Sequence, residues 1–243
     1  MYLAVALLVI IALLVIQFFV FGPRQFRNRA KFVTDYAVKR GYRLVNPDIA
    51  QISGNSSAKD ILTNPSWKSF VKGSEGITDI EGLERATDDP FGFTCNLRSK
   101  DVMIFELSVS SQRPDDKGSA LHYKVAKIRD QGLPRFCLAR HSVVNLVQNV
   151  VDKLTGKPRS RIDVDAGTFP EFAKHYWLEG SDSAAVLPFF SPPKIAFLGN
   201  SKAEGVIATN SRYFVYFESG RLQSDKDCDM FIATVENLVS NLL

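Results

Sequence analysis

Residues 91–110 read FGFTCNLRSKDVMIFELSVS, and the alternation within them decides the fold class. Two apolar-rich runs, 91–97 and 102–110, flank the polar residues 98–101, which predicts two antiparallel strands joined by a hairpin turn. The second run alternates between two sets of residues: Val102, Ile104, Glu106 and Ser108, and Met103, Phe105, Leu107 and Val109. Such alternation is typical of a sheet with one face on the core.

Similar patterns recur towards the C-terminus. Further strands are predicted at 121–128, 135–139 and 172–178, with a last hairpin joining 206–209 to 213–217 around Asn210 and Ser211. Helices are predicted at 57–63, at 142–154, from Ala184 to a stop at Pro192 and Pro193, and from about Ser224 onwards. The predicted fold class is therefore α+β, with a soluble domain of antiparallel hairpins and helices packed on one face.

The N-terminal segment has a different character. Residues 2–21 read YLAVALLVIIALLVIQFFVF and carry no charged side chain. A helix of this length spans about 30 Å, the thickness of a bilayer's hydrocarbon core. A cleaved signal peptide would have a basic start, a shorter apolar run and small residues at its end, whereas this run ends in bulky residues. We therefore predict a single transmembrane anchor over residues 1–22.

Basic residues follow this segment, and none precedes it. Residues 24–43 carry a net charge of +6, which leaves −2 for residues 44–243 of a chain whose total is +4. Because basic residues beside a span stay in the cytoplasm, we expect an inner-membrane protein with its N-terminus outside and its domain in the cytoplasm. The predicted membrane-interface residues are Arg24, Arg27, Arg29 and Lys31. The slightly acidic domain argues against a nucleic-acid partner, which would require a basic face.

Residues 23–43 predict a basic amphipathic helix next to the membrane, because four apolar residues fall on one face: Phe26, Ala30, Val33 and Ala37. One interpretation is a surface helix that binds anionic lipid. The other, which we favour, is a connecting helix whose apolar stripe packs on the domain. Beyond it, 44–158 and 159–243 form two α+β regions or one joint domain, the second ending in the C-terminal helix.

The sequence contains no recognisable motif for catalysis, for a cofactor or for a metal. Three weaker candidates have simpler structural explanations. Cys137 and His141 could form a thiol–imidazole pair. Asp163 and Asp165 resemble the start of a calcium loop, although Gly167 lacks the expected oxygen ligand. Aromatic residues at 175–177, 189–190 and 213–217 could line a ligand groove, but such residues are more often core. We therefore predict no catalytic, cofactor-binding or metal-binding residue.

Several short stretches carry a resemblance to a known group of proteins. They are Leu133-Pro134-Arg135-Phe136, Phe169-Pro170-Glu171-Phe172 leading to Tyr176, the Gly180-Ser181-Asp182 turn, and Phe190-Ser191-Pro192 before the last hairpin and helix. With these, residues 90–243 resemble an uncharacterised family of bacterial membrane-anchored proteins of unknown function. The resemblance implies a membrane anchor and a soluble α+β region, and it implies no activity.

These observations favour a membrane-tethered, non-enzymatic interaction protein, such as an accessory subunit of a membrane protein complex. Its expected partners are the lipid bilayer and other membrane proteins. Two alternatives remain open: a ligand-sensing domain with an aromatic-lined pocket, and an enzyme whose dispersed site has no sequence signature.

Overall fold

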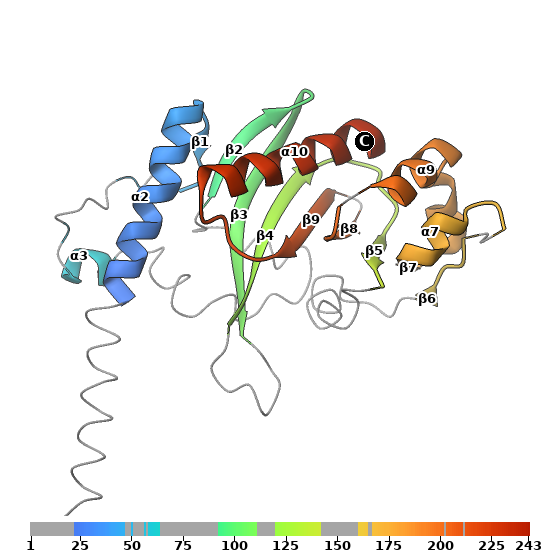
Figure 1. The fold of residues 1–243 in the computed structure, drawn as a ribbon, viewed down its shortest axis with the longest axis horizontal. Helices are drawn as coiled ribbons and strands as arrows, with labels where there is room; N and C mark the ends of the chain where they lie inside the picture. Colours follow the sequence, from blue (N-terminus) through green and yellow to red (C-terminus); the bar gives the residue numbers. More distant parts are fainter. Residues whose placement is uncertain are drawn as a thin grey trace, which may run out of the picture.

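The computed structural model describes residues 22–46, 50, 56, 58–63, 92–110, 120–141, 160–164, 167–201, 203–210 and 212–243. Its centre is a nine-stranded sheet in the order β1-β2-β3-β4-β9-β8-β5-β7-β6 (Figure 1), and every neighbouring pair is antiparallel. Strands β9 and β8 lie between β4 and β5, so chain segments on both sides of residue 158 share one sheet. The α+β prediction is confirmed at this level.

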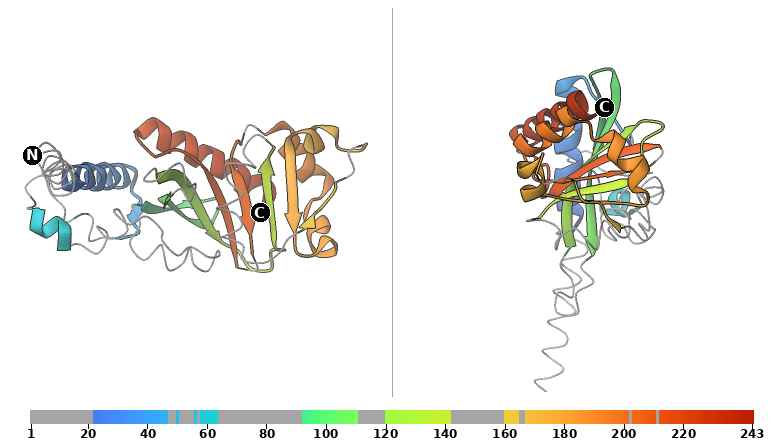
Figure 2. Two further views of the ribbon diagram at one scale, coloured as in Figure 1. Left: turned by 90° about the horizontal axis from the view of Figure 1, so that it is seen from below. Right: turned by 90° about the vertical axis from the view of Figure 1, so that its right-hand side faces the viewer.

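The strands are β1 (Arg43–Leu44), β2 (Gly92–Leu97), β3 (Lys100–Ser110), β4 (Ala120–Arg129), β5 (Phe136–Arg140), β6 (Ser160–Arg161), β7 (Tyr176–Gly180), β8 (Val206–Thr209) and β9 (Tyr213–Ser219). The helices are α2 (Gly22–Arg40), α3 (Ala58–Thr63), α7 (Pro170–His175), α8 (Ser183–Val186), η3 (Leu187–Phe189), α9 (Pro192–Asn200) and α10 (Asp225–Leu242). Helix α2 lies at one end of the sheet, α10 crosses its middle, and α7 and α9 lie towards the other end (Figures 1 and 2).

The β2–β3 hairpin forms as predicted, with Phe93 opposite Ile104 and Cys95 opposite Val102. Its turn is shorter than the predicted 98–101. Only Arg98 and Ser99 turn the chain, with φ angles of 51° and 65°, as a two-residue hairpin loop requires. The Asn96 side chain accepts a hydrogen bond of 3.1 Å from the Ser99 amide and so supports this conformation.

Both faces of the sheet are buried, which differs from the prediction of one core face. Val102 and Ile104 on β3 belong to a first apolar cluster, which also holds the buried residues of α2, α3, α7, α8, α9 and α10. Phe105 and Leu107 point the other way into a second cluster, whose described members all lie in strands. The described helices therefore pack on the first face.

Two segments near prolines differ from the prediction. Residues 172–178 were expected to form one strand, but Pro170–His175 is helix α7 and only Tyr176–Gly180 is a strand. The helical stretch of α8 and η3 ends before Pro192, as expected, but the sequence analysis did not predict that α9 begins at Pro192. Helices α7 and α9 both have proline in their first turn, where the missing N–H is not needed and the fixed φ angle suits the helix.

Helix α2 agrees with the favoured prediction. Phe26, Ala30, Val33 and Ala37 are all buried in the first cluster, and Gly41 ends the helix with a φ angle of 69°. In the part of the chain that the structure describes, no helix is long and apolar enough to cross a membrane. The predicted anchor up to residue 21 and the predicted helix at 142–154 lie outside the described residues.

Candidate functional site

The structure divides the four residues predicted at the membrane interface into two pairs. Arg24 and Lys31 lie on the exposed outer face of α2. Arg27 and Arg29 instead contact the domain. The Arg27 Nη2 atom donates a hydrogen bond of 2.5 Å to the carbonyl oxygen of Ser56. Half of the residues predicted at the membrane interface therefore bind protein groups, and the other half remain exposed.

Arg29 takes part in a buried ion pair between α2 and the sheet. Its Nη2 atom lies 2.5 Å from Oε1 of Glu106 on β3, and each side chain is only 12% exposed. Its Nη1 atom donates to the carbonyl oxygen of Leu222, in the connection between β9 and α10. The Leu222 amide in turn donates to Glu106 Oε1 at 2.5 Å. Three elements therefore meet at one guanidinium group.

Burial works against both charges of this pair. Desolvation raises the pKa of Glu106, although the Arg29 charge opposes the shift. Desolvation likewise lowers the pKa of Arg29 against the opposing effect of Glu106. A pair whose desolvation outweighs its attraction adds little net stability, whereas removal of one partner costs about 3–5 kcal/mol. The contact therefore discriminates strongly between correct and incorrect packing of α2.

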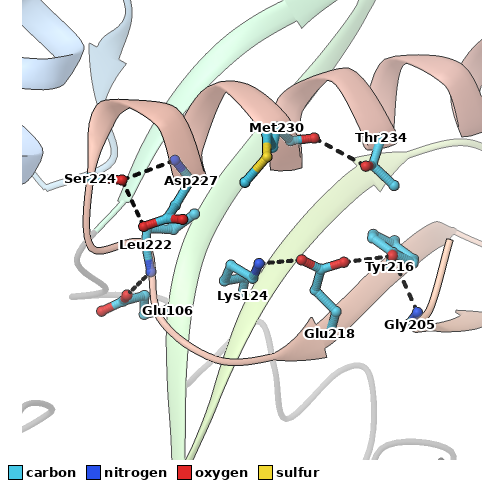
Figure 3. A network of polar contacts seen from close by, with 10 residues as sticks. All are labelled: Glu106, Lys124, Gly205, Tyr216, Glu218, Leu222, Ser224, Asp227, Met230 and Thr234. Carbon is cyan, nitrogen blue, oxygen red and sulfur yellow. Dashed lines mark hydrogen bonds and ion pairs between the residues drawn. The ribbon is translucent and has the colours of Figure 1, made fainter. Parts of the chain in front are cut away.

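The ion pair continues across the sheet as a row of alternating charge, which we call the charged row: Arg29, Glu106, Lys124 and Glu218. Lys124 on β4 lies opposite Glu106 on β3 and opposite Glu218 on β9. The Lys124 ammonium forms an ion pair with Glu218 and lies 5.4 Å from the ring centroid of Phe231 on α10. Figure 3 shows three members of this row, Glu106, Lys124 and Glu218, beneath α10.

The charged row ends in a tyrosine that is buried under α10. The Tyr216 hydroxyl donates to Glu218 Oε2 at 2.8 Å and accepts from the Gly205 amide at 3.3 Å (Figure 3). Burial, followed by the Glu218 charge, raises the pKa of Tyr216, so this group stays a neutral donor. A Cβ atom at Gly205 would lie 2.5 Å from the Tyr216 ring, and only glycine allows this close approach.

Exposed polar contacts join the C-terminal end of α2 to the N-terminal end of α10. Lys39 pairs with Asp225 and Arg40 with Asp229, each at 2.5 Å, with side chains that are 40–65% exposed. The Tyr36 hydroxyl also donates to Asp229, at 2.7 Å. Bases at a helix C-terminus and acids at an N-terminus suit both helix dipoles. Because the two ion pairs are solvated, each is worth only about 0–1 kcal/mol.

A second group of polar side chains lies at the opposite end of the sheet. We call it the edge cluster: His141, Arg161, Trp177 and Glu179. The Arg161 guanidinium lies 4.5 Å from the Trp177 ring centroid, and the Trp177 Nε1 atom donates to Glu179 at 2.8 Å. The His141 ring meets the indole edge-on, with centroids 6.1 Å apart. Arg161 itself is largely exposed and also pairs with Asp163.

The weaker sequence candidates are not assembled into sites. Four residues of extended chain span about 13 Å, so Cys137 on β5 and His141 just after it are too far apart for a thiol–imidazole pair. Asp163 pairs with Arg161 at 2.8 Å, while Asp165 lies outside the described residues. The rings of 213–217 are buried in the core. Among the described residues, no three metal-binding side chains gather.

Sequence reasoning missed the charged row, although one of its members left a signal. Glu106 falls in the same alternating set as Val102 and Ile104, which are fully buried on the α10 side of β3. A carboxylate among apolar side chains on a buried face of a sheet requires a basic or hydrogen-bonding partner there. The sequence does not say which base supplies it, because Arg29 lies far away on another element.

Comparison of the chain with models of known protein families, with characterised proteins and with solved structures finds no match. The resemblance of residues 90–243 to membrane-anchored bacterial proteins therefore stays a prediction.

Proposed function

We propose that this chain is a membrane-tethered, non-enzymatic accessory subunit of an inner-membrane protein complex, with its N-terminus outside and its domain in the cytoplasm. The observation that carries the proposal is the packing of α2. This helix is described from Gly22, the last residue of the predicted anchor, and buries its apolar face in the domain as far as Ala37. The docked helix follows the predicted span directly in the sequence, and this supports a domain held close to the bilayer and to neighbouring membrane proteins.

The exposed residues of α2 support the same proposal. Arg24 and Lys31 are seven residues apart and lie on one exposed helix face. A rise of 1.5 Å per residue places Arg24 about 3 Å beyond Gly22, within the headgroup layer that flanks the hydrocarbon core. Arg24 can therefore contact lipid phosphates while Arg29 stays within the domain.

Cell fractionation and co-purification test the two parts of the proposal. We expect the full chain to stay in the membrane after salt and alkaline washes, and a variant lacking residues 1–21 to be released. After mild detergent extraction, the full chain should migrate on native gels with other membrane proteins. Release of the full chain by salt would contradict the anchor, and recovery only as a monomer would contradict the accessory role.

The ligand-sensing alternative rests on one observation, the edge cluster. Trp177 is half-buried, and Arg161 and His141 pack against it. A thermal shift of the full chain with a panel of metabolites, repeated with Trp177→Phe, tests this alternative. A shift that disappears in the variant would favour it over the accessory role.

A further inference from the structure

The apolar stripe of α2 does not by itself define where the helix docks. Two of the five buried apolar residues of α2, Ala30 and Ala37, are alanines with little shape to recognise, whereas Tyr36 packs on Phe93 and favours the observed position. A slide of one helical turn, 5.4 Å, moves Ala30 towards the site of Phe26 and keeps an apolar residue there. Burial of apolar area is non-directional, so several registers of α2 would satisfy it in part.

The exposed contacts between α2 and α10 are also permissive. Lys39 and Arg40 are long, flexible and solvated, and their partners Asp225 and Asp229 lie one helical turn apart on α10. After a slide, either base could pair with the neighbouring acid or with water. These two ion pairs favour the helix end as a whole and select no single register, although the Tyr36 hydroxyl, which donates to Asp229 at 2.7 Å, favours the observed one.

Arg29 differs because both its acceptors are buried and belong to different elements. Glu106 is held on β3, and the Leu222 carbonyl is held in the β9–α10 connection. The Leu222 amide also donates to Glu106, so the two acceptors are fixed relative to each other. A displacement of one turn would take the guanidinium away from both and leave two buried charges without partners.

We propose that the Arg29–Glu106 pair is required, in addition to the packing of Tyr36, for the single register in which α2 docks, so that movement of the membrane segment is transmitted directly to β3 and to the start of α10. This inference rests on the proposed function, because it assumes that α2 continues a membrane anchor. It adds that the domain keeps a defined orientation relative to the bilayer. In this role the pair provides specificity rather than stability.

Pulsed electron spin resonance on the full chain in detergent micelles tests the proposal. Spin labels at Lys31→Cys and Met230→Cys, both exposed, report the position of α2 against α10, while the native cysteines are buried. In the doubly labelled chain without further substitutions, we expect a single, narrow distribution of distances between the two labels. Adding Arg29→Met with Glu106→Leu should broaden or split the distribution and leave the melting temperature at least as high. Adding Arg40→Gln, the matched control, should leave the distance narrow.

An unchanged narrow distance in the double variant would overturn the proposal, because apolar packing alone would then set the register. Unfolding of the double variant would overturn it equally, because the pair would then supply stability. Arg29→Lys gives a second test: it keeps the charge but loses the forked geometry, and should broaden the distance less. The measurement needs no bilayer and no partner, so a failure of the proposed function would leave its outcome interpretable.

Discussion

The two ends of the sheet use charged side chains in opposite ways. At the α2 end, Arg29 and Glu106 come from distant segments and are 12% exposed. At the β6–β7 end, Arg161 and Glu179 face each other on neighbouring strands, and Arg161 is 57% exposed. The first arrangement depends on the correct packing of a whole helix, whereas the second depends only on local strand pairing. Burial therefore determines which charges the tertiary structure needs.

The largest expected effect follows from replacing Arg29 with methionine. Glu106 would lose its cation, and the Leu222 carbonyl its donor, while both stay buried. We expect the free energy of unfolding to fall by about 3–5 kcal/mol. Denaturant unfolding of the full chain in detergent measures this, with Arg161→Met at the other end as the matched control. A loss no larger than in the control would show that the two ends do not differ.

The pH dependence of stability should carry a component from Glu106. Burial raises its folded pKa above the ordinary 4.5. Such a group stabilises the fold fully below its unfolded pKa, and this contribution is lost as the pH rises through the folded pKa. Unfolding of the wild type and of Glu106→Gln should be compared from pH 4 upwards. The wild type should lose stability relative to the variant as the pH rises; a relative gain would show that attraction to Arg29 outweighs burial.

Replacing Tyr216 with phenylalanine should have an intermediate effect. The ring stays in place, but the Gly205 amide loses its acceptor and Glu218 loses a donor beneath α10. An unsatisfied buried group costs about 1–3 kcal/mol. Tyr176→Phe is the matched control, since its hydroxyl makes only a long bond of 3.5 Å to Ala203. Equal losses of stability in the two variants would mean that the hydrogen bonds between Tyr216 and the end of the charged row do not contribute to stability.

At the edge cluster, Arg161→Gln should have a small effect. The variant loses the contact between the guanidinium and the Trp177 ring and the exposed pair with Asp163. An exposed cation–π contact is worth about 0.5–1 kcal/mol. Thermal unfolding together with tryptophan fluorescence measures both stability and the ring's surroundings. A loss as large as that of Arg29→Met would overturn the contrast between the ends.

The smallest effect is expected for Lys39→Gln, which removes the exposed pair with Asp225 between α2 and α10. Solvated pairs contribute about 0–1 kcal/mol and are weakened by salt. The difference from wild type should therefore be small and should vanish in high salt. A large, salt-insensitive loss would show that the helix ends, rather than Arg29, hold α2 in place.

Local patterns were predictable from sequence, and long-range pairing was not. The alternation in 102–110 predicted β3, and the stripe from Phe26 to Ala37 predicted the packed face of α2. Ser224 was the expected start of the last helix and caps it by accepting from the Asp227 amide. These features depend on neighbours within a few residues. By contrast, Arg29 and Leu222 are 193 residues apart, and no spacing in the sequence links them.

One wrong expectation and one feature that was not predicted have physical causes. Pro192 was interpreted only through proline's ability to stop a helix, although proline also favours a helix's first turn, as it does at the start of α7 and α9. The insertion of β8 and β9 between β4 and β5 depends on pairings distant in sequence, such as Val125 with Phe217. The alternation of residues within a segment predicts that the segment is a strand, but it does not identify the strand that pairs with it.

The most direct test of the account is hydrogen exchange on the full chain in lipid nanodiscs. If α2 is docked through its whole buried face, its amides from Phe26 to Ala37 should exchange together with those of α10, in one cooperative unit. In Arg29→Met they should exchange earlier than α10. Rapid exchange of α2 in the wild type, independent of α10, would contradict the claim that the helix beside the predicted anchor and the domain form one body.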